Sequence, residues 1–171
     1  MHDAAPAIRK LFACLSLLLL GPTLWSATAV ADDWPQWRGV QRDGIWREAG
    51  IVEKLPEELP AKWKVEVGAG YSGPTVANGR VYLTDRLTKP DEVERIHCFD
   101  EQTGKTLWSH TYPAAYGKIG YQAGPRASVT VNDGLAYALG ATGMLHCLDA
   151  ASGDIRWKKD LRSSDKTLFL M

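Results

Sequence analysis

The sequence has little cysteine and no excess of charge of either sign. Three cysteines occur among 171 residues, and 20 lysines and arginines balance 20 aspartates and glutamates. Nucleic-acid-binding domains normally carry a basic excess or a basic stripe, so the balanced charge argues against a nucleic-acid partner. With 45% hydrophobic and 23% charged residues, the composition also excludes long-range disorder and a collagen-like repeat.

No apolar run is long enough to span a bilayer as a helix. The longest, from Leu11 to Leu20, has about half of the roughly 20 residues that a span needs. It follows Arg9 and Lys10 and ends at a Gly-Pro pair, before a stretch of small residues. We therefore predict that residues 1–31 form a signal peptide, that the chain is exported to the periplasm or outside the cell, and that no stable membrane anchor remains after cleavage. An uncleaved membrane anchor is the alternative.

Glycine, proline and tryptophan are abundant, with 16, 9 and 7 copies, a mixture that favours short strands joined by tight turns. The chain also repeats itself. Residues 96–108 return as residues 145–157, with histidine, cysteine, aspartate, glycine and tryptophan each recurring 49 positions later. Residues 75–82 match residues 130–137 at an offset of 55. We place the six-residue difference in the connection 84–92, because loops tolerate insertions.

Each copy is predicted to form four short antiparallel strands. They cover residues 74–77, 80–84, 94–100 and 106–111 in the first copy, and 128–131, 135–139, 144–149 and 154–160 in the second. Four strands per repeat, with a tryptophan in the fourth, are typical of a β-propeller blade. The prediction is an all-β chain with two blades, at about 71–111 and 124–161; a meander in a β-sandwich is the alternative.

An orphan strand is predicted ahead of the first blade. Residues 62–67 carry Trp63, which lies 45 positions before Trp108 and so aligns with the fourth strand of a further blade. The predicted domains are an N-terminal extended segment at 32–60, an incomplete propeller at 61–161 and a non-repeat tail at 162–171. This pattern indicates an N-terminal fragment of a longer propeller, and a short chain that completes its ring by oligomerising is the alternative.

The repeated side chains have predicted structural roles. Trp108 and Trp157 are expected to fill the wedge between neighbouring blades. Asp100 and Asp149 are expected to accept backbone N–H bonds from the turns that follow them, which argues against a catalytic role.

Two adjacent His-Cys pairs invite a metal-site interpretation. Neighbouring residues on a strand point to opposite faces, so neither pair can chelate from one face. Equivalent positions in separate blades are also too far apart for a disulfide. We therefore predict reduced, structural cysteines and no metal ligands among His97, Cys98, His146 and Cys147.

Residues 145–157 resemble the repeat of pyrroloquinoline-quinone-type (PQQ-like) propellers, whose usual form is Leu-x-Ala-Leu-Asp-Ala-x-Thr-Gly-x-x-x-Trp. Residues 33–39 and 42–44, Asp-Trp-Pro-Gln-Trp-Arg-Gly and Arg-Asp-Gly, resemble the N-terminal signature of a secreted branch of that superfamily. The resemblance implies a β-propeller fold. It says less about function, because the superfamily includes quinone-dependent alcohol dehydrogenases and scaffolds such as the propeller lipoprotein of outer-membrane barrel assembly.

Two functions follow from this resemblance. The first is an exported, non-catalytic binding or scaffold module with a protein partner and with self-association through open blade edges. The alternative is the N-terminal part of a quinone-dependent alcohol dehydrogenase, for which the resemblance alone implies pyrroloquinoline quinone and Ca²⁺.

No catalytic or metal-binding residue is assigned from the sequence. Tyr116, Tyr121 and Arg126, in the glycine-rich connection 112–126, are the candidates for holding an anionic ligand, and packing between blades is the alternative. The chain by itself is predicted to lack enzymatic activity and to bind the quinone weakly or not at all.

Overall fold

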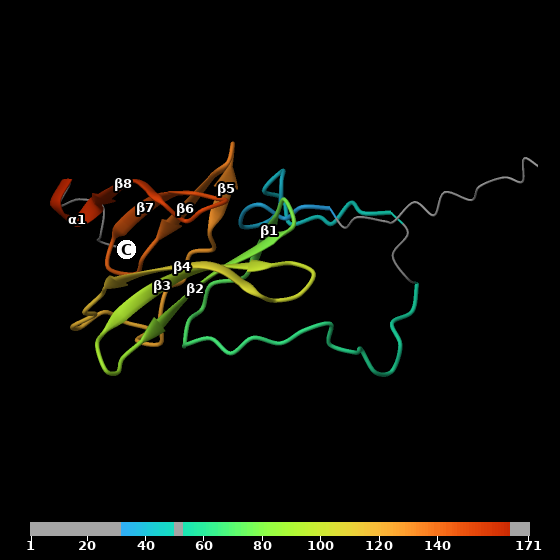
Figure 1. The fold of residues 1–171 in the computed structure, drawn as a ribbon, viewed down its shortest axis with the longest axis horizontal. Coiled ribbons are helices and arrows are strands. Elements are labelled where there is room, and N and C mark those ends of the chain that lie inside the picture. Colours follow the sequence, from blue (N-terminus) through green and yellow to red (C-terminus); the bar gives the residue numbers. More distant parts are fainter. Residues whose placement is uncertain (1–31, 50–52, 165–171) are drawn as a thin grey trace, which may run out of the picture. The chain divides into compact units, whose positions relative to one another are not determined.

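Two four-stranded antiparallel sheets make up the computed structural model, which describes residues 32–49 and 53–164 (Figure 1). The first sheet contains β1 (Thr75–Ala77), β2 (Arg80–Leu87), β3 (Val93–Asp100) and β4 (Thr106–Pro113). The second contains β5 (Thr130–Asn132), β6 (Leu135–Leu139), β7 (Met144–Asp149) and β8 (Ile155–Asp160), followed by the short helix α1 (Leu161–Ser164). In each sheet the spatial order is the chain order, and the two sheets do not close into a ring. The predicted pair of blades is confirmed.

The predicted hairpin turns are present at the start of both blades. Asn78 and Gly79 connect β1 to β2 with φ values of 52° and 71°, and Asp133 and Gly134 connect β5 to β6 with 48° and 73°. Two successive left-handed residues match the right-handed twist of flanking strands, and Asn-Gly and Asp-Gly are the pairs that adopt them most readily. The local sequence therefore determines these two turns.

The 49-residue offset corresponds to one repeated register. Cys98 lies opposite Tyr82 and Trp108, Cys147 lies opposite Tyr137 and Trp157, and in both blades the register shifts directly after the cysteine. Both cysteines are free and buried in separate sheets, as predicted. Burial also raises the pKa of the Cys98 thiol to about 11, so that it stays protonated.

Five of the six extra residues of the first blade lengthen the strands of a hairpin, and one lengthens its loop. β2 and β3 each have eight residues, against five in β6 and six in β7. Their pairing continues beyond the predicted end at Thr84, through Asp85↔Arg95 and Arg86↔Glu94. The expected loop insertion was wrong because the added residues can continue the ladder, and they bring four charged groups to the end of the blade.

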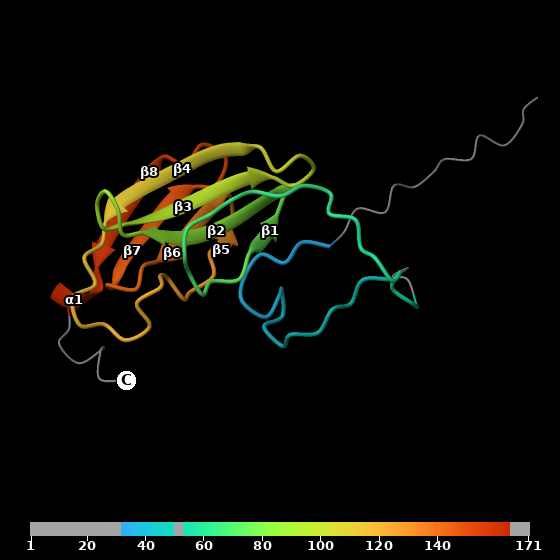
Figure 2. The ribbon, with the colours of Figure 1, turned by 90° about the horizontal axis from the view of Figure 1, so that it is seen from below.

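The two blades pack face to face (Figures 1 and 2) and share one core. Ile96 and Tyr82 from the first blade join Val129, Ala136 and Leu148 from the second in a single buried cluster. Two buried hydrogen bonds also cross the interface. The Tyr82 hydroxyl donates to the Ala150 carbonyl over 3.0 Å, and the Thr75 hydroxyl donates to the Val129 carbonyl over 2.5 Å.

The predicted orphan strand is not a strand, because residues 62–67 have no neighbouring ladder with which to pair. Trp63 nevertheless occupies the tertiary position that its spacing indicated. Its indole N–H donates to the Glu101 carbonyl over 2.8 Å, and its ring covers Gly104, where a Cβ would lie 2.7 Å from the indole. The sequence spacing therefore predicted the position of the Trp63 side chain correctly, but its prediction of a hydrogen-bonded strand was wrong.

Trp108 repeats this contact against the second blade. Its indole N–H donates to the Ala150 carbonyl over 3.2 Å, and its ring covers Gly153, where a Cβ would lie 2.6 Å from the indole. Trp157 does not fill a wedge as expected, since 45% of its surface is exposed. The reason is that no third Gly-containing turn lies against it in the described part of the chain.

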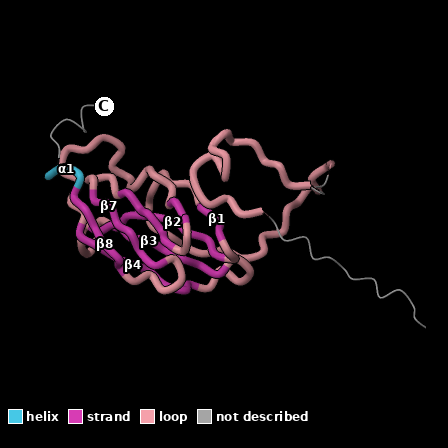
Figure 3. The backbone as a smooth tube through the Cα atoms, turned by 90° about the horizontal axis from the view of Figure 1, so that it is seen from above, coloured by secondary structure: helices cyan, strands magenta, loops and turns pink. Residues whose placement is uncertain are grey.

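The N-terminal segment joins the two blades where it begins. Trp34 exchanges backbone hydrogen bonds with Val76 of β1, at 2.8 and 3.1 Å, and the Pro35 carbonyl accepts from Val131 of β5 over 2.8 Å. The following residues, 36–43, form turns and bends, so the predicted extended segment is wrong for this stretch. Figure 3 draws the described chain ahead of β1 as loop.

The predicted signal peptide and most of the predicted tail lie outside the described residues. Within the described part, no helix has the length and apolarity needed to cross a membrane.

Candidate functional site

The three candidate residues of the inter-blade connection do not converge on one site. Tyr116 is 3% exposed and points into the protein, whereas Tyr121 is 73% exposed. Arg126 lies near Tyr121, with its Cζ 5.2 Å from the ring centroid, and it donates to the Gly120 carbonyl. The structure therefore brings Tyr121 and Arg126 together at the surface and separates Tyr116 from them.

Tyr116 belongs to a buried polar cluster around Glu94, which sequence reasoning missed. The Glu94 carboxylate is fully buried and accepts hydrogen bonds from the Tyr112 hydroxyl at 2.5 Å, the Tyr116 hydroxyl and the Ala141 N–H at 3.0 Å. A buried carboxylate is costly unless its oxygens are satisfied in this way. No local sequence motif predicts the buried role of Glu94, because its hydrogen-bond partners lie 18 to 47 residues away.

Arg86 closes the cluster on the side of the connection. Its guanidinium carbon lies 3.8 Å from the Tyr116 ring centroid, and it donates to the Glu92 carboxylate over 2.9 Å and to the Gln122 carbonyl over 2.5 Å. A cation over an aromatic face stabilises both groups when water is excluded. Arg86 therefore fastens the inter-blade connection to the first blade.

The phenols of this cluster act as hydrogen-bond donors. Burial is the main cause that raises the pKa of Tyr112 and of Tyr116, and the neighbouring Glu94 adds to it. Both hydroxyls stay protonated, and each donates to Glu94. Tyr116 is thus committed to an internal bond, which leaves Tyr121 and Arg126 as the exposed members of the predicted set.

His146 of the second blade packs against the same cluster. Its ring centroid lies 4.2 Å from that of Tyr112 and 5.2 Å from that of His110. Burial, with smaller contributions from His110 and Lys158, lowers the pKa of His146 to about 4. The imidazole is therefore neutral at pH 7, and its role is packing between the blades.

A second buried carboxylate, Asp85, is held within the first blade. It receives the Arg95 guanidinium and the Gly68 N–H, the latter at 2.5 Å, and the His97 Nε2 atom lies 3.1 Å from its Oδ1 atom outside hydrogen-bonding alignment. Burial alone would raise the pKa of Asp85, but the interactions with His97, Arg95 and Gly68 outweigh it and lower the pKa. Asp85 is consequently ionised and internally paired.

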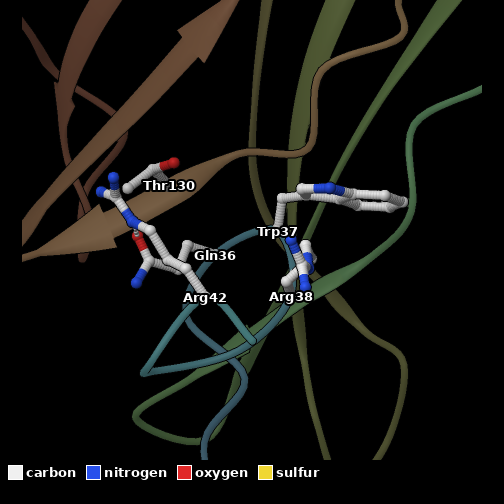
Figure 4. A pocket seen from close by; sticks show the side chains of 5 residues that line it. All are labelled: Gln36, Trp37, Arg38, Arg42 and Thr130. Atoms are coloured by element: carbon white, nitrogen blue, oxygen red, sulfur yellow. Dashed lines mark hydrogen bonds between the residues drawn. The ribbon is translucent and has the colours of Figure 1, made fainter. Parts of the chain in front are cut away.

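Two hollows open near the inter-blade surfaces. The larger, of about 450 Å³, is lined by Gln36, Trp37, Arg38, Arg42 and Thr130, and we call it the arginine pocket (Figure 4). The smaller, of about 210 Å³, includes Arg126, Leu139 and Gly140 in its wall. The first four residues of the arginine pocket belong to the N-terminal signature at 33–39 and 42–44. The sequence predicted no ligand role for them, because only the fold places them beside β5.

Comparison with known proteins supports the repeat assignment. Residues 92–168 match the PQQ_2 family model, described as "Outer membrane protein assembly factor BamB". The match covers the end of the first blade and all of the second. Over these residues the chain carries PQQ-like β-propeller repeats.

One solved structure supports the same fold, and two others are similar to a lesser degree. A quinohemoprotein alcohol dehydrogenase from Comamonas testosteroni is similar over 78% of this PQQ-like repeat protein and 20% of its own chain, with 24% identity and a TM-score of 0.56. A europium-containing methanol dehydrogenase matches over 60% and 18%, with 16% identity and a TM-score of 0.49. BamB from Moraxella catarrhalis matches over 57% and 26%, with 21% identity and a TM-score of 0.39.

The PQQ-like repeat protein spans about a quarter or less of the length of these three chains. At such identities the likeness concerns the fold. A search of curated proteins found no significant match.

The two buried carboxylates do not fit the calcium ion that the resemblance to quinone-dependent dehydrogenases implies. Ca²⁺ takes six to eight oxygen ligands, mostly from open carboxylates and carbonyls. The oxygens of Glu94 and Asp85 are already occupied by internal donors. No group of three or more His, Cys, Asp or Glu residues is arranged to hold a metal ion among the residues described.

Proposed function

We propose that this PQQ-like repeat protein is an exported, non-catalytic module that binds other protein surfaces through the open face of its second blade. The observation that carries the proposal is the unequal environment of two equivalent tryptophans. Trp108 is covered by the next blade, whereas Trp157 is exposed in the same register. The second blade thus presents a surface whose counterpart in the first blade is an interface.

The side chains around Trp157 support this role. Leu139 on β6 is also an exposed apolar residue, and the register places it on the same face of the sheet as Trp157. Exposed apolar groups that lie together mark surfaces of protein association, and tryptophan is enriched at the centre of such interfaces. The same exposed strand offers unpaired backbone groups for self-association through blade edges.

The buried acids support a non-catalytic role. Glu94 and Asp85 are nearly inaccessible to solvent and are held by internal donors. A general base must reach the proton that it removes, directly or through one water molecule. Neither carboxylate meets this condition.

The alternative function is the N-terminal part of a quinone-dependent alcohol dehydrogenase. The fold similarity to the Comamonas testosteroni enzyme favours it. Under this alternative, Tyr121 and Arg126 would contribute to an anionic-ligand site that other blades complete.

Sedimentation velocity and an activity assay test the two functions. For the scaffold module, we expect concentration-dependent association of the purified chain that Trp157→Gln weakens, and no dye reduction with alcohols in the presence of pyrroloquinoline quinone and Ca²⁺. Arg162→Gln, a change at another exposed site beyond β8, is the control for association. Alcohol-dependent dye reduction, together with association that is the same in Trp157→Gln, would support the alternative.

Export is tested separately. The full chain with its own leader should appear in the periplasmic or extracellular fraction, with Asp32 as its first residue by N-terminal sequencing. Retention of residues 1–31 on the exported or cytoplasmic protein would contradict this part of the proposal.

A further inference from the structure

The arginine pocket lies where the N-terminal segment meets both blades. In Figure 4 Arg42 lies on one side of the hollow next to Thr130, and Trp37 lies on the other side above Arg38. Two guanidinium groups therefore face one hollow from opposite walls. Neither of them forms an ion pair within the described residues, in contrast to Arg47 and Arg95.

The Asp43 carboxylate does not pair with either of these two arginines, although Arg38 binds the Asp43 backbone carbonyl. Asp43 pairs with Arg47, accepts the Ile45 N–H over 3.0 Å, and thereby has its oxygens occupied. The Arg47 hydrogen bond is the main cause that lowers the pKa of Asp43 to about 2, so this ion pair persists at neutral pH. Within the described residues, Arg38 and Arg42 therefore have no carboxylate paired with them.

Neutral contacts hold the two arginines in place. The Gln36 side-chain oxygen accepts from Arg42 Nε over 2.9 Å, and the Gln36 amide donates to the Val40 carbonyl over 3.1 Å. Arg38 donates one terminal nitrogen to the Asp43 carbonyl over 3.1 Å. The two terminal nitrogens of Arg42 stay available, and they form the fork that binds a carboxylate with two parallel hydrogen bonds.

The backbone of the loop is in an unfavourable conformation at both pocket arginines. Arg38 and Arg42 both adopt left-handed conformations, with φ of 66° and 59°. Such a conformation is unfavourable for a residue other than glycine and persists where the surroundings impose it. Three backbone hydrogen bonds of 3.0–3.1 Å close the loop between residues 36 and 44 and impose it here.

The loop is also anchored rigidly to the blades. Trp34 pairs with β1, and its ring covers Gly39, where a Cβ would lie 2.9 Å from the indole. The neighbouring Pro35 carbonyl binds the N–H of Val131 on β5. Because its walls are fixed before a ligand arrives, the pocket avoids part of the ordering cost of binding.

Trp37 gives the pocket an apolar wall. Its side chain is 69% exposed beside two charged groups, although burying an indole is favourable. A ring with an apolar face and polar substituents would cover the indole, while an acidic group on that ring would reach the arginines and a hydroxyl group would face Thr130.

We propose that the arginine pocket binds an acidic saccharide, with its carboxylate on Arg38 and Arg42 and its ring against Trp37. The inference does not depend on the open face of the second blade, because the pocket belongs to the N-terminal loop and β5.

Isothermal titration of the full chain with glucuronate tests the site. We expect saturable binding of glucuronate, no binding of neutral glucose, and weaker binding of acetate, which has the carboxylate without the ring. Arg38→Gln and Arg42→Gln should each weaken glucuronate binding about tenfold, since a hydrogen bond to a charged group contributes about 1.5 kcal/mol or more. Trp37→Ala should weaken glucuronate binding several-fold and leave acetate binding unchanged.

Two further variants separate local chemistry from net charge. Arg156→Gln removes one positive charge from the second blade, far along the chain, and should bind glucuronate like the unmodified chain. Arg47→Gln releases Asp43 to pair with the pocket arginines and should weaken binding. The proposal is overturned by an absence of saturable glucuronate binding up to about 10 mM, by binding that survives both pocket-arginine variants, or by equal affinity for acetate and glucuronate.

Discussion

At the scale of single residues, Gly153 of the second blade packs directly against Trp108 of the first. A Cβ at this position would lie 2.6 Å from the Trp108 indole, whereas one at Gly134 would meet nothing within 4 Å. The two glycines have nearly the same φ, 78° and 73°. They therefore allow the cost of the backbone conformation to be separated from the cost of the contact.

We predict that Gly153→Ala lowers the free energy of unfolding by about 2–4 kcal/mol and that Gly134→Ala lowers it by about 1 kcal/mol. The shared cost is the left-handed backbone, and the excess at Gly153 is the displaced tryptophan. Urea unfolding followed by far-ultraviolet circular dichroism measures both values. Equal losses in the two variants would contradict the close contact.

His146 makes the interface between the blades sensitive to acid. Its pKa is about 4 in the folded chain against 6.5 in the unfolded one, so the unfolded state binds more protons between these values. The free energy of unfolding must then fall as the pH falls from 6.5 to about 4. We predict a loss of about 2 kcal/mol over this range, measured by urea unfolding at several pH values.

The variant His146→Gln should reduce the slope of the stability profile between pH 6.5 and 4. The remaining slope is expected from the neighbouring His110, whose pKa burial also lowers. The lowered pKa of Asp85 acts mainly below its unfolded value of 3.8, so most of its loss of stability lies at more acid pH. An equally steep profile in the variant would show that another group titrates in this range.

At the scale of elements, the fourth strands β4 and β8 are the clearest comparison. They carry Trp108 and Trp157 in equivalent registers, opposite Cys98 and Cys147. Only Trp108 has a neighbouring turn to cover. The two tryptophans occupy equivalent positions but differ in burial, because burial depends on which residues pack against the strand.

We predict that Trp108→Ala lowers the free energy of unfolding by about 2–4 kcal/mol, through lost packing on Gly153 and a lost hydrogen bond to Ala150. Trp157→Ala, the matched variant, should cost less than about 1 kcal/mol. Urea unfolding at low protein concentration compares them without self-association. A large loss for Trp157→Ala would mean that the tryptophan is covered in solution.

At the scale of the whole molecule, long-range hydrogen bonds hold the blades together. The Tyr82 hydroxyl donates to the Ala150 carbonyl, 68 positions away. Tyr137 is its equivalent in the second blade, and its hydroxyl reaches no backbone carbonyl within the described residues. The N-terminal segment adds a second connection through Val76 and Val131.

We predict that Tyr82→Phe lowers the free energy of unfolding by about 1 kcal/mol, the typical contribution of one buried hydrogen bond. The loss is limited because Ala150 keeps its bond from Trp108. Tyr137→Phe should change stability by less than about 0.5 kcal/mol. Native-state hydrogen exchange would show whether Tyr82→Phe uncouples the blades, and equal effects of the two substitutions would refute the role of this bond.

The sequence by itself determined the features that are local or repeated. The Asn-Gly and Asp-Gly turns follow from backbone sterics, and the Asp100 and Asp149 turns follow from carboxylates that accept nearby N–H groups, as predicted. The 49-residue offset determined the two blades, because equivalent residues can repeat at a fixed spacing only if they occupy equivalent positions.

Only the tertiary structure decided the features that depend on distant neighbours. Glu94 is a buried hydrogen-bond acceptor because Tyr116 and Ala141 fold onto it. The segment that contains Trp63 is not a strand, because no neighbouring strand pairs with it. The arginine pocket likewise required the fold, since Arg42 and Thr130 meet only after the N-terminal segment pairs with both blades. The spacing of residues along the chain determines local backbone geometry. Burial and charge pairing instead depend on residues that are distant in sequence and become neighbours only in the folded chain.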